Sequence, residues 1–201
     1  MSETTPTGPG PAPGRRERKK AATRKALADA ALDLFLEHGF DKVSIRDIAE
    51  TADVSTTTLF KHFPSKEALV FDMDTDIETA LTAAVRDRSP GTSVVRALRA
   101  HLMGTRAFPA EQKERIAAFR RLVDSTPALT EYYRRMWMRH ERTLAETIAA
   151  DLGSAPDDPA CTALAHLALE AGTLAGISPA PAAAAGAAFD LLEKGWESTR
   201  R

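Results

Sequence analysis

Cysteine is almost absent from this chain, since Cys161 is the single example among 201 residues. One thiol excludes an internal disulfide framework and a thiolate zinc cluster within one chain. Because Cys161 lies in alanine-rich, helical surroundings, we expect it to be a small buried hydrophobic side chain. No apolar stretch is long enough to cross a bilayer, and the N-terminus lacks a charged segment followed by an apolar core. The sequence therefore predicts no membrane association and favours the cytoplasm.

Signatures of catalysis are also missing. The chain contains no G-x-S-x-G, no glycine-rich phosphate loop and no H-E-x-x-H motif. Its five histidines are potential bases, but none has a partner at a useful spacing. Glu170, four residues after His166, is as easily a pair on a helix surface. We therefore expect a protein that is not an enzyme and that needs neither a metal ion nor a cofactor.

Strand patterns are absent beyond Lys66, because the apolar residues there recur at spacings of three and four. A helical pattern also runs from about Glu17 to His38, where Gly39 can end the helix. The sequence therefore predicts an all-α protein with about nine helices. Six of these lie beyond the first 65 residues, at about 66–86, 93–106, 110–125, 128–152, 158–177 and 179–196.

The segment between Val43 and Lys66 is the most informative part of the chain. Ser44 can cap a first short helix, Asp53–Ser55 interrupts the apolar pattern, and Pro64 ends a second helix. The outer face of this second helix carries hydroxyl, ammonium and imidazole groups, which suit phosphates and base edges. These outward residues are Thr56, Thr57, Thr58, Lys61 and His62. The order of signals predicts a helix-turn-helix that binds DNA.

Part of this pattern has a simpler explanation. Any two amphipathic helices joined by a short loop resemble it, and threonine-rich helices occur in ordinary cores. DNA binding is favoured because several signals coincide: a capped helix, an apolar turn residue at Val54, a second helix that ends in H-F-P-S-K, and a third helix that starts at Lys66.

The net charge is positive in the N-terminal part of the chain, which contains the predicted DNA-binding segment, and negative in the remainder. Residues 1–66 contain 11 Lys and Arg against 9 Asp and Glu, whereas the remainder contains 16 against 19. A dense run of basic residues is typical of a surface that binds DNA phosphates, although the solvent-exposed start of a helix can have the same composition. Its members are Arg15, Arg16, Arg18, Lys19, Lys20, Arg24 and Lys25. Residues 1–14 interleave proline with glycine, so we expect a disordered tail there.

The stretch from about Arg18 to Met73 resembles the DNA-binding domain of the TetR family of transcriptional regulators. The resemblance rests on A-L-D-L-F-L-E-H-G-F-D-K-V-S-I-R-D-I-A and L-F-K-H-F-P-S-K-E-A-L. It implies a three-helix DNA-binding domain over residues 15–65 and a helical ligand-binding and dimerisation domain over residues 66–201. It also implies that bases are read by Arg46, Thr56, Thr57, Phe60 and Lys61, and that phosphates are held by Ser44, Thr58, His62 and Lys66.

Two positions depart from the pattern of that family. The turn residue is usually glycine and here is Asp53, which tolerates left-handed backbone better than most residues. The aromatic residue before the basic pair is usually tyrosine and here is Phe60. A hydroxyl contact to phosphate is then lost, while apolar contact with a thymine methyl group stays available.

The last two predicted helices are rich in alanine and glycine, with large apolar residues such as Leu164, Phe189 and Trp196 between them. Small residues allow helices to approach closely, which suits a helix pair that meets its copy in another subunit. Packing within one chain is the alternative. The resemblance favours a homodimer, because the last two helices of TetR-family proteins form a four-helix interface.

Bulky and polarizable side chains concentrate between Leu102 and His140, where they form either a core or a ligand cavity. One helical stripe, which includes Tyr133 and Trp137, favours a core, whereas Met136 and His140 fall on a neighbouring line with Tyr132. The candidate ligand-binding residues are Arg99, Met103, Phe119, Tyr132, Met136, Trp137 and His140.

The class of ligand is open at this stage. Arg96, Arg99 and Arg106 share one side of a predicted helix, which is usually a solvated face but would favour an anion at a cavity mouth. The segment from Arg120 to Leu129 resembles a TetR subgroup whose C-terminal domain binds acyl-CoA-like ligands. A hydrophobic drug-like compound or natural product is the alternative.

These observations together predict a homodimeric repressor on a palindromic operator of double-stranded DNA, released by a hydrophobic or amphipathic small-molecule effector. The competing hypothesis is a structural or cell-division factor that is built on the same fold and binds DNA without a ligand. A ligand-sized cavity in the C-terminal half would distinguish the two.

Overall fold

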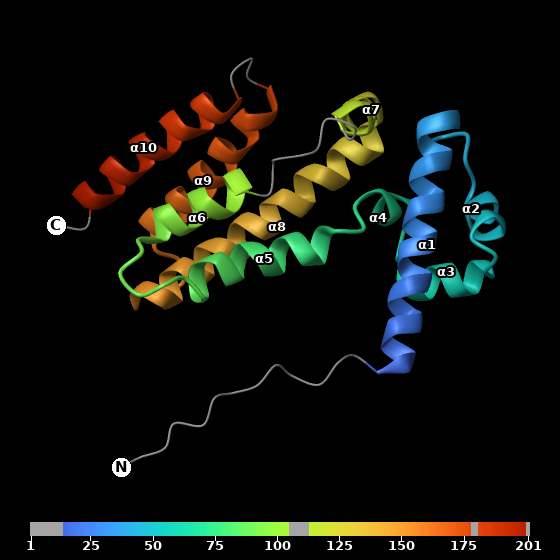
Figure 1. The fold of residues 1–201 in the computed structure, drawn as a ribbon, viewed down its shortest axis with the longest axis horizontal. Helices are drawn as coiled ribbons and strands as arrows, with labels where there is room; N and C mark the ends of the chain where they lie inside the picture. The colour runs from blue at the N-terminus through green and yellow to red at the C-terminus, as the bar shows by residue number, and fades with distance from the viewer. Residues whose placement is uncertain (1–13, 105–112, 178–180, 200–201) are drawn as a thin grey trace, which may run out of the picture. The chain divides into compact units, whose positions relative to one another are not determined.

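A computed structural model describes residues 14–104, 113–177 and 181–199, and the predicted tail over residues 1–14 lies outside them except for Gly14. Every regular element of the described part is a helix, which confirms the predicted all-α class (Figure 1). The helices are α1 (Arg15–His38), α2 (Ile45–Thr51), α3 (Thr56–His62), α4 (Lys66–Val70), α5 (Asp74–Arg86), α6 (Val94–Gly104), α7 (Lys113–Ser125), α8 (Pro127–Leu152), α9 (Pro159–Ile177) and α10 (Pro181–Thr199).

The prediction of one long helix over residues 66–86 is wrong. A turn over residues 71–73 separates α4 from α5, and the Asp74 N–H donates to the Phe71 carbonyl at 3.1 Å. No glycine or proline marks this break in the sequence. Side-chain contacts of Phe71 and Asp74 with α8 hold the turn, so tertiary packing overrides local helix propensity. The described residues therefore form ten helices rather than nine.

The chain divides into two compact units, with the boundary between Val70 and Phe71. This boundary is five residues later than the predicted start of the second domain at Lys66, because α4 packs on α1 and belongs to the first unit. The core of the first unit combines one face of α1 with the inner faces of α2, α3 and α4. Its fully buried side chains include Leu27, Phe35, Ile48, Leu59, Phe63 and Leu69.

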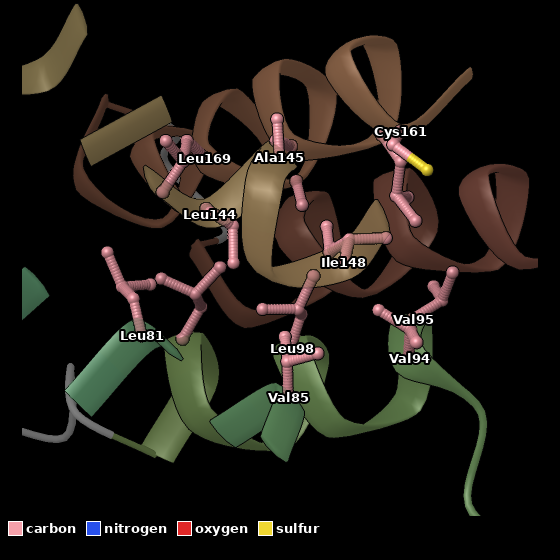
Figure 2. Packing of buried hydrophobic residues seen from close by; sticks show 14 of the residues in the cluster. Leu81, Val85, Val94, Val95, Leu98, Leu144, Ala145, Ile148, Cys161 and Leu169 are labelled. Carbon is pink, nitrogen blue, oxygen red and sulfur yellow. The ribbon is translucent and has the colours of Figure 1, made fainter. Parts of the chain in front are cut away.

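In the second unit, α8 packs between α5 and α9, and α10 packs on both α6 and α9. Figure 2 shows Leu81 and Val85 of α5 and Leu98 of α6 facing Leu144 and Ile148 of α8. Cys161 of α9 is fully buried in the same cluster, which confirms its prediction as a small hydrophobic side chain. Across the described ranges, no helix is long and apolar enough to span a membrane.

Candidate DNA interface and effector region

The first helix of the predicted motif begins with a complete capping box. The Ser44 hydroxyl accepts a hydrogen bond from the Asp47 N–H at 3.1 Å, and the Asp47 carboxylate accepts one from the Ser44 N–H at 2.8 Å. Hydrogen bonding from Ser44 lowers the pKa of Asp47, so this carboxylate stays ionised beside the positive end of the helix. The cap fixes where α2 starts.

The turn between α2 and α3 depends on Asp53. Its φ of 52° makes it the single non-glycine residue with positive φ in the part of the chain that the structure describes, which confirms the expected left-handed backbone. The Val54 N–H donates to the Ala49 carbonyl at 2.9 Å and closes the end of α2. Aspartate thus supports the sharp turn at the position where the TetR-family pattern usually has glycine.

The second helix, α3, has distinct inner and outer faces. Leu59 and the adjoining Phe63 are fully buried, while the Ser55 hydroxyl caps the helix by accepting from the Thr58 N–H at 3.1 Å. The Thr58 hydroxyl lies 2.9 Å from the same Ser55 oxygen and is only half-exposed. The other predicted base-reading residues of α3, namely Thr56, Thr57, Phe60 and Lys61, are exposed. Phe60 leaves 54% of its surface accessible, so this face presents an aromatic ring among polar groups.

Arg46 of α2 is exposed as well. Its Nε donates to the Glu50 carboxylate at 2.8 Å, one helical turn along, and this hydrogen bond raises the pKa of Arg46. Exposed pairs of this kind contribute little to stability, so the guanidinium can exchange Glu50 for another partner.

His62 lies at the end of α3, next to the basic face of α1. The Arg24 guanidinium donates to the His62 carbonyl at 2.7 Å and lies 4.1 Å from the centre of the Phe63 ring. Burial, followed by the charges of Lys20 and Arg24, lowers the pKa of His62. Near pH 7 the imidazole is therefore neutral and can offer a phosphate a hydrogen bond but no charge.

Lys66, the first residue of α4, is engaged inside the first unit. Its ammonium donates to the Phe40 carbonyl at 2.5 Å and lies 4.2 Å from the centre of the Phe40 ring. Burial lowers its pKa. The predicted role of Lys66 in phosphate binding does not include this contact, because residues 26 positions apart carry no periodic signal.

In the second unit, the structure brings together five of the seven predicted ligand-binding residues, Phe119, Tyr132, Met136, Trp137 and His140. Phe71 stacks on Tyr132 with ring centres 5.3 Å apart and meets the edge of Phe119 at 6.1 Å. Trp137 meets His140 edge to face at 5.3 Å, and Met136 is buried on the same helix. One side of α8 thus forms a continuous aromatic surface.

Two carboxylates from α5 meet the end of this aromatic surface. The Asp74 carboxylate lies 2.6 Å from His140 Nε2 and also accepts from the Arg139 guanidinium. Glu78 lies one turn further along α5, with its Oε2 4.0 Å from His140 Nε2 and 3.6 Å from Arg139 Nε. No cluster of metal-ligating side chains occurs within the described ranges.

The other two predicted ligand-binding residues lie elsewhere. Met103 of α6 packs against the hydrophobic core, and the Arg99 guanidinium donates to Asp190 of α10 at 2.5 Å. Arg96 forms a similar pair with Glu193 of α10, while Arg106 lies outside the described residues. The two arginines therefore neutralise carboxylates of α10 instead of converging with the aromatic side chains of α8.

An apolar groove runs between α9 and α10. Its lining includes Leu167, Leu174, Leu191 and Trp196, and Glu170 is its one charged residue. Leu167 and Leu191 leave 49% and 72% of their surfaces accessible, which is unusual for large aliphatic side chains that lie near one another.

Both units match family models. The model described as bacterial regulatory proteins of the tetR family matches residues 27–73, and the model described as the MftR C-terminal domain matches residues 92–198. The chain belongs to the TetR family. It is a DNA-binding, helix-turn-helix transcriptional regulator of that family.

Relatives support this assignment over most of the chain. The HTH-type transcriptional regulator TcmR of Streptomyces glaucescens is 36% identical over 163 residues, which are 78% of this chain and 70% of the relative. The putative mycofactocin biosynthesis transcriptional regulator MftR of Mycobacterium tuberculosis is 30% identical over 142 residues, which are 70% and 71% of the two chains. A solved SmeT–triclosan complex shares the TetR-family fold, with a TM-score of 0.56, 21% identity and coverage of 87% of this chain and 91% of that one.

Lys66→Ala should destabilise this TetR-family regulator. Loss of the ammonium leaves the Phe40 carbonyl without its donor and removes the cation from the Phe40 ring, so we expect the free energy of unfolding to fall by about 1–3 kcal/mol. Lys61→Ala, at an exposed lysine of the same unit, should change it by less than about 0.5 kcal/mol. Urea unfolding of both variants measures the difference, and equal stability of the two would contradict the structural role of Lys66.

Proposed function

We propose that this TetR-family regulator is a homodimeric repressor that binds a palindromic operator and is released from it by a small-molecule effector. The observation that carries the proposal is the outer face of α3. There Thr56, Thr57, Phe60 and Lys61 are exposed together on a helix that is capped at its start and anchored by buried Leu59. Such a helix can enter a major groove and present these side chains to base edges.

Roles in DNA binding divide by the chemistry of each side chain. Arg46, Thr56, Thr57, Phe60 and Lys61 are assigned to bases; Ser44, Thr58, His62 and Lys66 are assigned to phosphates. The Ser44 hydroxyl already caps α2, and the Thr58 hydroxyl already contacts the hydroxyl of Ser55, which caps α3. Their contact with phosphate therefore accompanies that of the N–H groups at the helix starts. Lys66 shares its ammonium between phosphate and the Phe40 carbonyl.

The apolar groove between α9 and α10 is assigned to the dimer interface. Leu167 and Leu191 are exposed in one chain and become buried when the same surface of a second copy packs against them. A two-fold axis through this interface pairs two reading helices. The half-sites of the operator then lie about 34–36 Å apart, or a small multiple of that distance.

Effector binding is assigned to the second unit, along the aromatic surface of α8. Phe71 and Asp74 lie on this surface and follow directly on α4 in the chain, so a guest that moves them acts on the connection to the DNA-binding unit. A hundredfold loss of operator affinity requires about 2.7 kcal/mol of preference for the released conformation. The effector is hydrophobic or amphipathic, either an acyl-CoA-like compound or a natural product, and reaches the regulator in the cytoplasm, where bacterial DNA lies.

Arg46→Ala should relax the preference for one symmetric base pair of the operator. An arginine that reads guanine contributes about 1–3 kcal/mol of discrimination per contact. The exposed ion pair with Glu50 does not prevent the Arg46 side chain from reaching a base. Binding to a set of single-base operator variants measures the effect. Arg16→Ala, in the exposed basic run of α1, is the control and should weaken binding to all sequences alike; a uniform loss for Arg46→Ala as well would place Arg46 among the phosphate contacts.

Leu191→Glu should produce a monomer. The side chain is exposed in a single chain, so the substitution leaves folding intact, whereas in a dimer it puts an unpaired carboxylate into an apolar seam at a cost of several kcal/mol. Sedimentation should show the loss of the dimer, together with the loss of operator binding. The control is Met138→Glu, at an exposed apolar residue of α8, and this protein should stay dimeric. A Leu191→Glu protein that remains a dimer would overturn this interface.

A further inference from the structure

Among the described residues of the second unit, four buried side-chain atoms take part in no hydrogen bond. Glu193 Oε1 forms an ion pair with Arg96 at 2.5 Å, and the other three atoms lie close to one another. They are Glu78 Oε2, Trp137 Nε1 and His140 Nδ1. The imidazole joins the other two groups, since its Nε2 lies 4.0 Å from Glu78 Oε2 and its ring centre lies 5.3 Å from that of Trp137. Buried polar groups in folded proteins nearly always have partners, so a cluster of three points to a polar guest.

The Asp74 carboxylate determines what His140 can offer to such a guest. A carboxylate accepts, so the 2.6 Å contact places a proton on His140 Nε2. Nδ1 is then the ring nitrogen that remains for a ligand, and an imidazole nitrogen can accept or donate a hydrogen bond. Glu78 Oε2 is an acceptor, whereas the indole Nε1–H of Trp137 is a donor. The unsatisfied set therefore consists of one acceptor, one donor and one ring nitrogen that can act as either.

This set selects the chemistry of the guest. Hydroxyl groups can donate to Glu78 Oε2, can accept from Trp137 Nε1–H and can do either at His140 Nδ1. A carboxylate or phosphate has no hydrogen to donate and meets the negative charges of Asp74 and Glu78. A cation meets Arg139, whose guanidinium already contacts both carboxylates. An uncharged hydroxylated compound fits these constraints.

The side chains around the three polar atoms indicate which shape of ligand fits and from which side it can enter. Tyr133 and Trp137 contact each other edge to face at 5.7 Å, beside the stacked pair of Phe71 and Tyr132, so the neighbouring surface suits flat aromatic rings. The His140 side chain is fully buried, but the side chain of Glu78 is 30% exposed. A guest can therefore approach the polar cluster from the side of Glu78.

We propose that His140 Nδ1, Glu78 Oε2 and Trp137 Nε1–H form the polar end of the effector site, and that the effector is an uncharged, hydroxylated aromatic compound. The inference rests on the proposed effector response and narrows it, because it selects against an acyl-CoA. The proposed site also connects effector binding with the start of α5. The imidazole that binds the guest is the one that holds Asp74 at the start of α5, four residues after the end of α4.

The test compares hydroxylated rings with their hydroxyl-free parents on the full-length protein. The probes are 1,5-dihydroxynaphthalene with naphthalene, 1,8-dihydroxyanthraquinone with anthraquinone, and palmitoyl-CoA as the anionic amphiphile. Calorimetry measures binding, and operator release is followed in the same samples. At least one hydroxylated ring should bind tenfold or more tightly than its parent and release the operator, because a site built to bond hydroxyls rejects the analogue that lacks them.

Matched variants connect this preference with the named atoms. Trp137→Phe keeps an aromatic ring and removes the N–H donor together with part of the indole, and Glu78→Met keeps the length of the side chain and removes the carboxylate acceptor. Each should reduce the preference for the hydroxylated ring to about threefold or less while operator affinity without ligand is unchanged. Glu146→Met, at an exposed glutamate of α8, should keep the full preference. Melting temperatures confirm that each variant is folded.

The outcomes separate this inference from the proposed function. Operator release by palmitoyl-CoA or by the hydroxyl-free rings, with the two variants unaffected, overturns the inference and leaves an effector-released repressor. Binding of no probe overturns the inference too. Binding that depends on the hydroxyls, in a protein that binds no operator, supports the site and overturns the proposed repressor.

Discussion

The attachment of Asp74 and Phe71 to α8 is the constraint on which the organisation of the second unit depends. His140 and Arg139 hold the Asp74 carboxylate from two consecutive positions on α8, while Tyr132 stacks on Phe71 two turns earlier. These contacts break what would otherwise be one helix and determine where α5 begins. They also connect the start of α5, four residues after the end of α4, with the buried imidazole of His140.

The two functional regions use polar groups in opposite ways. In the DNA-binding unit, the candidate reading residues are exposed, and their existing partners are weak or local, as with Arg46 and Glu50. Water satisfies these groups until DNA replaces it. In the second unit, the polar groups of Trp137 and His140 are buried among aromatic rings, so a guest that satisfies them gains more than it would at the surface. The proposed repressor needs both behaviours, since DNA must bind and leave while the effector must be recognised among similar compounds.

Local signals made the helix-turn-helix predictable. The caps at Ser44 and Ser55, the left-handed turn at Asp53 and the buried Leu59 all depend on neighbours within a few residues, and the sequence shows them directly. Contacts between distant segments were not predictable in the same way. The Lys66–Phe40 contact and the Arg99–Asp190 pair join residues 26 and 91 positions apart, and the turn at residues 71–73 carries no glycine or proline. Composition indicated the aromatic region of α8, but the polar cluster within it required Asp74 and Glu78 from another helix.

The central claim is that two copies of this chain present their α3 helices to a two-fold symmetric DNA site. Sequencing of DNA selected from a random library by the purified full-length protein tests it most directly. We expect one enriched inverted repeat, with half-sites centred about 10 base pairs apart or a small multiple of that spacing. Enrichment of a single unrepeated motif, or of no motif at all, would contradict it.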